Sequence, residues 1–214
     1  MILNFLLFLA SGTSFADALP LDELIAKAQE RYEKTDDIKA QFIQEVTIKA
    51  MNKTEREEGV VYVKNPRRML WVYSKPRAKR LIINPKKAWL YIPEDHAAYV
   101  QDTENIYRSK LAVKFLSGIG KLSQDFYVGF SKPNNVDRND NYLLTLIPRV
   151  SDTGVDKLYV TIDKENFQII QCSFTDLYGN LTRIRLTDIR INNNLDDKLF
   201  SFKPPSGVDV FNMP

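Results

Sequence analysis

The chain has 214 residues, of which 44% are hydrophobic and 27% charged, and its formal net charge is +3. These proportions are those of a globular protein, and they exclude an intrinsically disordered chain. The small net charge gives no strong indication of a nucleic-acid partner. The length suits one all-β domain or two small ones.

The first 18 residues have the pattern of a cleaved export signal. Met1–Ala10 is almost wholly apolar, and the Ala-Asp-Ala at positions 16–18 is the small-x-small pattern that signal peptidase accepts. The apolar run is too short to span a bilayer comfortably. Met1–Asn4 lacks the usual basic residue, so an uncleaved anchor or a strand is the alternative. We expect cleavage after about Ala18, no lipid anchor because no cysteine follows the run, and a single exported domain over residues 19–214.

A helix and a long strand are predicted to open the mature chain. Leu21–Lys34 has apolar residues at helical spacing and follows Pro20, which marks a helix start. Ile38–Ala50 alternates between apolar and polar residues, as a strand with one wet face does. Met51–Glu58 is charged and is predicted to be a hairpin loop.

The stretch Gly59–Pro93 is predicted to be an antiparallel meander. Its apolar runs are rich in Val, Ile, Tyr and Trp and are separated by joints at Pro66, Pro76 and Pro85. Side chains alternate with period two along a strand. Met69, Trp71 and Tyr73 therefore share one face and form a broad apolar wall. Ala97–Gln101 is predicted to add one short strand.

The segment Tyr107–Asp125 changes to helical spacing and is predicted to form one or two short helices. Ser109 suits an N-cap, and Gly118 and Gly120 provide a joint. Because the segment lies between strands, it must cross a face or an end of the sheet. A lid over a cavity and an ordinary covering helix are equally compatible with this pattern.

Five further strands are predicted in the second half of the chain, joined by turns at residues 163–166 and 178–180. The predicted strands are Phe126–Phe130, Tyr142–Ile147, Leu158–Asp163, Phe167–Thr175 and Leu181–Ile191. A short turn at Asp196–Leu199 and an extended tail complete the chain. The total of about ten or eleven strands is large for an open sheet and favours a curled one.

The sequence offers little equipment for catalysis. His96 is the sole histidine, which excludes a multi-histidine metal site within one chain. Neighbouring carboxylates such as Asp36 and Asp37 point apart on a strand and commonly decorate loops. Cys172 lies in an apolar strand and is expected to be a buried structural thiol. We therefore expect a binding protein, not an enzyme, with no metal and no cofactor.

The chain resembles the LolA type of periplasmic lipoprotein carrier. The match rests on Ile38–Gln44 after the first helix, on the G-x-x-Y-x-K-x-P-x-x-M-x-W-x-Y block at Gly59–Tyr73, and on W-L-Y-x-P at Trp89–Pro93. The tail L-F-S-F-K-P-P-S-G-V-D-V at Leu199–Val210 completes it. The tail and the tryptophan block are fairly specific, whereas the helix alone is not.

This resemblance implies a mainly β fold with a few helices: a curled, incomplete antiparallel β-barrel with a helical lid over an apolar cavity. It implies a monomeric periplasmic carrier for the acyl chains of diacylated or triacylated lipoproteins. The implied partners are an inner-membrane ABC transporter that releases the cargo and the outer membrane, or an acceptor there, that receives it. A lipid- or lipoprotein-sensing adaptor of the same fold is the alternative, and a lipid-processing enzyme is disfavoured.

Three groups of residues are predicted to form the binding site. The lid is expected to present Leu111, Phe115, Leu116 and Ile119. In this family a basic residue in the K-x-P turn is thought to hold the lid shut; the matching position is Asn65, with Lys64, Arg67 and Arg68 nearby. The cavity is expected to be lined by Phe42, Val46, Val61, Val63, Met69, Trp71, Tyr73, Leu81, Ile83, Trp89, Tyr91, Leu144, Leu146, Val160, Ile162, Ile170, Phe174, Ile184 and Leu186. A dry packed core is the alternative for each of these positions.

Overall fold

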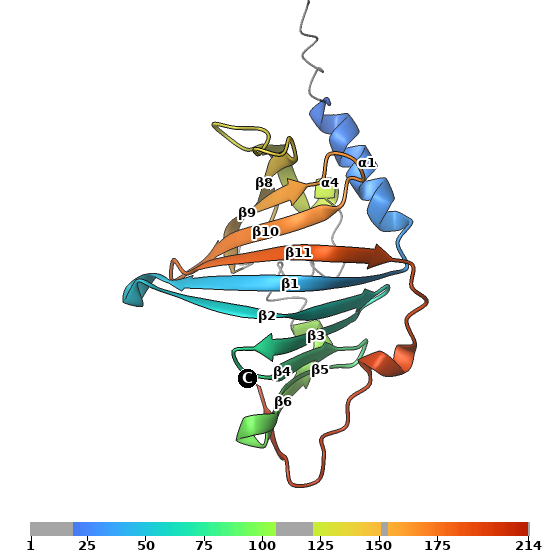
Figure 1. Ribbon diagram of the computed structural model, residues 1–214, viewed down its shortest axis with the longest axis vertical. Helices are drawn as coiled ribbons and strands as arrows, with labels where there is room; N and C mark the ends of the chain where they lie inside the picture. Colours follow the sequence, from blue (N-terminus) through green and yellow to red (C-terminus); the bar gives the residue numbers. More distant parts are fainter. Residues whose placement is uncertain (1–18, 106–121, 151–153, 214) are drawn as a thin grey trace, which may run out of the picture.

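The computed structural model describes residues 19–105, 122–150 and 154–213 (Figure 1). A single twelve-stranded sheet dominates these residues, in the order β12-β6-β5-β4-β3-β2-β1-β11-β10-β9-β8-β7. The strands are β1 (Asp37–Ile48), β2 (Lys53–Lys64), β3 (Arg68–Lys75), β4 (Lys79–Ile83), β5 (Lys87–Ile92), β6 (Ala97–Asp102), β7 (Phe126–Phe130), β8 (Tyr142–Pro148), β9 (Val155–Ile162), β10 (Ile169–Asp176), β11 (Leu181–Ile191) and β12 (Asp209–Asn212). The helices are α1 (Leu21–Glu33), α4 (Leu122–Asp125) and the short 3-10 turns η1 (Lys49–Met51), η2 (Pro93–Asp95) and η3 (Asp197–Phe200).

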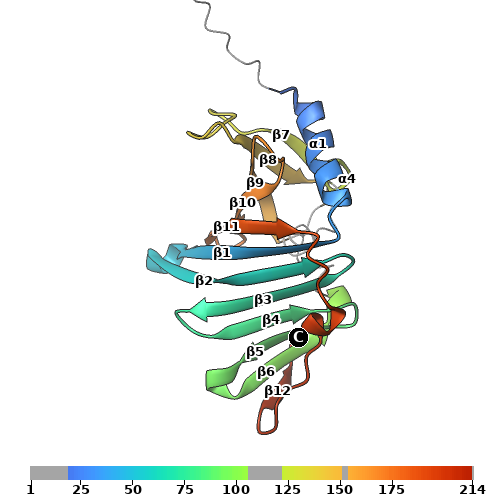
Figure 2. The same cartoon turned by 45° about the vertical axis from the view of Figure 1, so that its right-hand side comes forward.

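The sheet consists of two consecutive meanders joined at its centre. Strands β1 to β6 and strands β7 to β11 each pair antiparallel with their neighbours in the chain, and β1 pairs with β11 to unite them. The last strand, β12, lies parallel to β6. Because β7 and β12 are the two edge strands, the sheet is curled but open (Figures 1 and 2). The mainly β, curled architecture expected from the sequence is confirmed, with twelve strands instead of about ten or eleven.

The prediction of a hairpin loop over Met51–Glu58 was wrong. Strand β2 begins at Lys53 and pairs with β1 along its whole length. Charged side chains neutralise one another across the strands, as Arg56 does with Glu45 at 3.7 Å. The segment contains no Gly or Pro before Gly59 to interrupt it, so a charged strand can extend into solvent.

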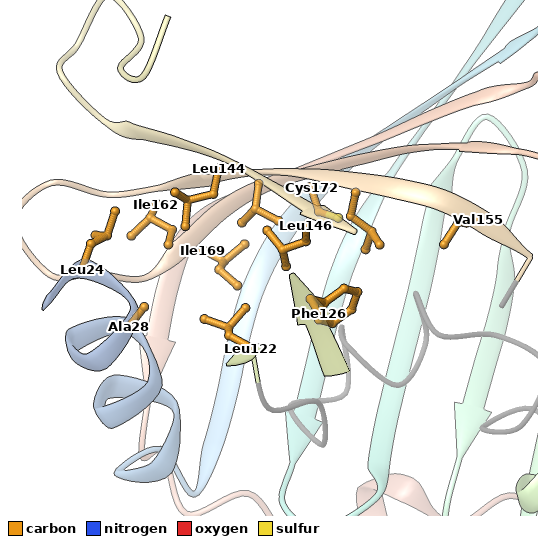
Figure 3. Close-up of a cluster of buried hydrophobic side chains, with 12 residues drawn as sticks. Leu24, Ala28, Leu122, Phe126, Leu144, Leu146, Val155, Ile162, Ile169 and Cys172 are labelled. Atoms are coloured by element: carbon orange, nitrogen blue, oxygen red, sulfur yellow. The ribbon is translucent and has the colours of Figure 1, made fainter. Parts of the chain in front are cut away.

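Helix α1 covers the β8–β10 half of one face of the sheet, here called the inner face. The helix begins after Pro20 and has Asp22 and Glu23 in its first turn, where carboxylates favour the helix dipole. Its side chains Leu24 and Ala28 are fully buried. Figure 3 shows them pointing toward the strands beside Leu122 of α4.

The buried side chains beneath α1 and α4 form the helix-covered cluster. Its members come from both helices and from β7 to β10: Leu24, Ala28, Leu122, Phe126, Leu144, Leu146, Val155, Leu158, Val160, Ile162, Ile169 and Cys172.

The opposite face of β2 to β5, here called the outer face, is covered by the chain that follows β11. Figure 2 shows this chain descending along the sheet to β12. Phe200, at the end of η3, is buried against Leu70 and Ile82, and Leu195 and Phe202 pack beside it. We call this set the outer-face cluster. Both faces of this part of the sheet are therefore apolar.

None of the helices in the described ranges is long and apolar enough to cross a membrane.

Candidate functional site: an apolar inner face

Three aromatic rings occupy the middle of the inner face. The centroid of the Phe42 ring lies 4.6 Å from Trp71 and 4.9 Å from Tyr73, both edge-on, and the Trp71 and Tyr73 rings are stacked at 6.3 Å. The Trp71 indole N–H donates to Met69 Sδ, so its polar atom has a partner within the apolar surface. Such edge and offset arrangements are the favourable geometries for aromatic pairs. The rings therefore form one preorganised surface.

Around these rings lies the inner-face cluster, contributed by β1 to β5 and β11. Its buried members are Ala40, Phe42, Val61, Val63, Met69, Trp71, Tyr73, Ile83, Ala88 and Ile184, with Ile38, Leu81, Leu186 and Ile189 packed beside them. No described helix contributes a side chain to this cluster. Cys172 of the helix-covered cluster is the cross-strand partner of Ile184, so the two clusters share one face of the sheet.

Gly59 leaves room for the Phe42 ring and for the Val72 carbonyl oxygen. A Cβ at position 59 would lie 2.0 Å from the carbonyl oxygen of Val72 and 2.8 Å from the Phe42 ring. The residue also sits at a register shift between β2 and β3. A strand glycine of this kind marks a close approach of neighbouring groups.

A polar cluster borders the aromatic surface on the side of the β1–β2 hairpin. The Tyr73 hydroxyl donates to Gln44 Oε1 at 3.2 Å, and Lys79 Nζ forms an ion pair with Glu57 at 2.6 Å while lying 4.4 Å from the Tyr73 ring centroid. Burial raises the pKa of Tyr73, and the charge of Glu57 adds to the effect. The phenol is therefore neutral, and it places a hydrogen-bonding group at the edge of an otherwise apolar region.

The structure brings ten of the nineteen predicted cavity residues into the inner-face cluster and places an eleventh, Val46, on the same face of the sheet. The ten cluster members are Phe42, Val61, Val63, Met69, Trp71, Tyr73, Leu81, Ile83, Ile184 and Leu186. Val46 pairs with Thr182 of β11 and lies two residues after Gln44, on the same side of β1. The alternation of β1 puts Val46 on the inner face but at its polar border.

Four predicted cavity residues are packed beneath the helices instead. Leu144, Leu146, Val160 and Ile162 belong to the helix-covered cluster, and each is at most 2% exposed. Phe174 is half-buried at the border of the same cluster. Leu24 and Ala28 fill the space that a ligand would need beside these strands, so this half of the inner face is a packed core.

Three predicted cavity residues do not join the others. Trp89 and Tyr91 lie on the outer face, with ring centroids 5.4 Å and 5.2 Å from that of Phe202. Both faces of β5 are apolar, and the pairing of Ala88 with Ile83 turns the small alanine inward. Ile170 adjoins a register shift in β10 and lines a surface hollow with Gln171 and Arg185. The period-two pattern alone could not choose between faces at these positions.

The residues of the predicted latch region are engaged in different contacts. Lys64 and Arg68 both form ion pairs with Asp197 of η3, at 2.6 Å and 3.0 Å. The Asn65 amide donates to the carbonyl oxygen of Thr35 at 2.8 Å. Arg67 forms an ion pair with Glu104. The predicted lid residues Leu111, Phe115, Leu116 and Ile119 lie outside the described residues.

Sequence reasoning missed several members of the inner face. Ile38, Ala88 and Ile189 belong to the inner-face cluster, and the alternation of β1 could have indicated Ile38.

The described residues show no centre for metal or thiol chemistry. No group of three or more His, Cys, Asp or Glu side chains suitable for a metal occurs in the described part of the chain. Burial raises the pKa of the Cys172 thiol to about 12, which keeps it protonated and unreactive. The inner face therefore offers apolar contact with a hydrogen-bonding border.

Comparison with known proteins decides the family. The model of a family described as outer membrane lipoprotein carrier protein LolA matches residues 33–203. The chain belongs to the LolA family. Among its relatives in this family, an outer-membrane lipoprotein carrier protein of Pseudomonas paraeruginosa is 27% identical over 206 residues, which cover 96% of this chain and 95% of the relative. One of Methylococcus capsulatus is 29% identical over 153 residues, covering 72% and 70% of the two chains.

Solved structures support the fold assigned to this LolA-family chain. An uncharacterized conserved protein from Thermus thermophilus superposes with a TM-score of 0.55 at 13% identity, covering 90% of this chain and 98% of its own. A DUF1329 family protein from Desulfovibrio piger superposes with a TM-score of 0.50, also at 13% identity, covering 85% and 97%. At this level of identity the likeness concerns the fold alone.

Proposed function

We propose that the protein is a periplasmic carrier that binds the acyl chains of outer-membrane-directed lipoproteins on its inner face. In this proposal it receives them from an inner-membrane lipoprotein-releasing ABC transporter and delivers them to the outer membrane or to an acceptor there. Membership of the LolA family supports the role. The observation that carries it is the aromatic and aliphatic inner-face cluster, to which no described helix contributes.

The physical properties of this surface suit a carrier. Burying an acyl chain contributes about 0.8 kcal/mol for each methylene, so apolar contact alone can hold a lipid without covalent or metal chemistry. Release requires that part of this gain be offset by the cost of opening the binding state. The direction of transfer then follows from differences in affinity between successive proteins, and no enzymatic step is needed.

The lid and latch belong to the same proposal. Leu111, Phe115, Leu116 and Ile119 would contact the acyl chains from a lid above the inner face. Asn65 already donates to Thr35, and Lys64 and Arg68 contact Asp197 on the outer side. Arg67 pairs with Glu104 at the approach to residues 106–121. We therefore assign the basic latch to Arg67 instead of the matching position Asn65.

Native mass spectrometry of residues 19–214 with a triacylated lipopeptide, and separately with the same peptide without acyl chains, tests the carrier role. We expect one-to-one binding of the acylated form only. Half-buried Leu81 lies on the inner face opposite Trp71 and its neighbour Arg80 is exposed, so the two provide a matched pair. Leu81→Gln should weaken binding about tenfold, the equivalent of one half-buried leucine.

Arg80→Gln should leave the affinity unchanged. Equal binding of both peptides, or of neither, would contradict the carrier role and favour the adaptor. Equal losses in the two variants would remove the inner face from the proposal.

A further inference from the structure

Two neighbouring hairpin tips at one end of the sheet expose large apolar side chains. Met51, in the tip between β1 and β2, is 65% exposed, and Leu177 and Tyr178, in the turn between β10 and β11, are 79% and 85% exposed. The backbone N–H of Lys49 donates to the side-chain oxygen of Asn180 at 3.1 Å, so the two tips lie side by side (Figure 1). We call Met51, Leu177 and Tyr178 the apolar tip.

The turn between β10 and β11 holds its two apolar side chains in solvent by its own hydrogen bonds. The Asp176 carboxylate accepts from the backbone N–H groups of Tyr178 and Asn180 and from the Asn180 amide, each at 2.9 Å. The Gly179 N–H donates to the Asp176 carbonyl oxygen, also at 2.9 Å. Because the backbone is fixed in this way, the exposure of Leu177 is a property of a built turn.

The same strands end in polar turns on the other side. Strand β2 leads into β3 through residues 65–67, and β9 leads into β10 through residues 163–168. Neither of these turns has an exposed large hydrophobic side chain. Single apolar side chains are common on protein surfaces, but a group of them at one end of a molecule indicates a contact surface.

The shape of the apolar tip suits a lipid surface better than a protein. Its three side chains project from two convex turns, and they cannot supply the roughly 800 Å² that each partner of a stable protein complex buries. A lipid surface deforms around separate side chains. It accepts leucine and methionine among the acyl chains and favours tyrosine at the level of the head groups.

Lys49 adds a positive charge beside the apolar tip. Its Cδ and Nζ atoms lie 2.7 Å and 3.3 Å from the place where a Cβ on Gly179 would be, so its stem runs along the turn. The nearby carboxylates have partners of their own: Asp176 binds its own turn, and Glu55 pairs with Lys53 at 2.9 Å. A cation next to apolar and aromatic side chains is the composition that binds membrane interfaces.

The apolar tip also adjoins the end of the inner face. Val46 and Phe174 are both cross-strand partners of Thr182 on that side of the sheet. Both are half-buried, and they lie between the inner-face cluster and the hairpin tips. A lipid surface that receives the tip is therefore next to the end of the inner face.

We propose that the apolar tip inserts into the surface of a phospholipid membrane, with Lys49 at the level of the head groups. The protein then docks with one end of its inner face toward the lipid. This inference goes beyond the proposed carrier function, because it assigns a membrane contact to the protein whatever its cargo. A second copy of the chain is the competing occupant of the tip.

Flotation of residues 19–214 with vesicles of phosphatidylethanolamine and phosphatidylglycerol tests the contact. Wild-type protein should float with the vesicles. The double variant Leu177→Ser with Tyr178→Ser should lower the partition coefficient at least about tenfold, because two apolar side chains no longer leave water. The control Val210→Ser changes a side chain that is 51% exposed on the edge strand β12, and it should leave the partition coefficient unchanged.

A cross-comparison separates the apolar tip from the inner face, which is apolar as well. Leu81→Gln, on the inner face, should float with vesicles as wild-type protein does. The double variant of the tip should keep the wild-type affinity for the acylated lipopeptide. Loss of flotation in Leu81→Gln would assign vesicle binding to the inner face and overturn the proposal.

A second measurement locates the contact directly. Cys172 is buried and its thiol is protonated, so a thiol-reactive fluorophore labels only an introduced cysteine. A label on Met51→Cys should become brighter and shift to the blue when vesicles are added, because it enters an apolar medium. A label on Glu165→Cys, exposed in the turn at the other end of β10, should not change.

Equal flotation of wild-type protein and the double variant, or a Met51→Cys label that does not respond, would overturn the membrane contact. A concentration-dependent dimer that the double variant abolishes, without flotation, would assign the tip to a second copy and overturn it too. These outcomes leave the carrier function intact. Failure to bind the acylated lipopeptide would overturn the carrier function and leave the membrane contact standing.

Discussion

At the scale of single residues, the aromatic surface depends on the absence of a side chain at Gly59. The Phe42 ring occupies the space where a Cβ would lie, and the Val72 carbonyl oxygen is closer still. Because the nearest of these atoms belongs to the backbone of the next strand, the structure cannot yield by rotating a side chain.

Gly59→Ala should therefore lower the free energy of unfolding by about 3 kcal/mol, at the upper end of the range for overpacking. Urea unfolding followed by tryptophan fluorescence measures it, since Trp71 lies in this surface. Gly129→Ala is the control, because a Cβ there meets nothing within 4 Å, and it should change stability by less than about 0.5 kcal/mol. Similar unfolding midpoints for the two variants would show that the close approach at Gly59 is relieved at little cost.

The residue scale also shows where sequence reasoning succeeds. Period two placed Met69, Trp71 and Tyr73 on one face, and the structure confirms it. The same rule failed at Trp89 and Tyr91, because β5 is apolar on both sides and the choice of face depends on how Ala88 packs against β4.

At the scale of elements, the start of β1 is fixed to the segment after β11 by one carboxylate. Asp37 is buried, and its oxygens accept from the backbone N–H groups of Asn193 at 2.7 Å and Leu195 at 2.9 Å and from the Asn193 amide at 3.0 Å. Burial alone would raise the pKa of Asp37, but these hydrogen bonds and the charge of Lys64 outweigh it and lower the pKa below its usual value.

Asp37→Asn should cost about 2 kcal/mol of stability near neutral pH, because it removes a charged acceptor from three donors. The lowered pKa means that the ionised carboxylate stabilises the folded state at every pH above the unfolded-state pKa of about 4. This contribution is lost as the pH falls through the folded-state pKa. Urea titrations at several pH values should therefore show a constant difference between pH 5 and 7 that vanishes in stronger acid. A difference that persists there would mean that packing, not charge, is responsible.

Element boundaries followed the sequence wherever Gly, Pro or a change of period marked them. Helix α1 and strands β7, β8 and β11 lie within a few residues of their predicted limits. The charged first half of β2 was missed because its stability comes from cross-strand pairs such as Glu45 with Arg56, which a single strand does not reveal. The sequence analysis grouped Asp37 with carboxylates that commonly lie in loops. Its structural role could not be predicted, because its hydrogen-bond partners lie 156 and 158 residues further along the chain.

At the scale of the whole molecule, the sheet between β2 and β5 is buried on both faces. The inner-face cluster lies on one side and the outer-face cluster, with Phe200 at 1% exposure, on the other. The chain that follows β11 is therefore a structural layer, and η3 fixes it through the ion pairs of Asp197 with Lys64 and Arg68.

Phe200→Ala should destabilise the protein by about 3–5 kcal/mol, as expected for a fully buried phenylalanine. Phe211→Ala, at a position 48% exposed, is the control and should cost less than about 1 kcal/mol. Thermal unfolding gives the stabilities, and limited proteolysis should cut the Phe200 variant between β11 and β12. An intact tail and an unchanged melting temperature would show that the outer face needs no cover.

The pairing of β1 with β11 has a consequence for how the chain acquires this shape. The ladder pairs residues such as Gln41 with Thr187, and the Gln41 side-chain amide also donates to Asp188, 147 positions away. This ladder is the seam between the two meanders. Contacts of such high sequence separation form slowly, because a long loop must close first. During synthesis the amino-terminal meander emerges first, and one long edge of β1 stays unpaired until the carboxy-terminal meander arrives. An exposed edge of this kind is a template for aggregation until the seam has closed.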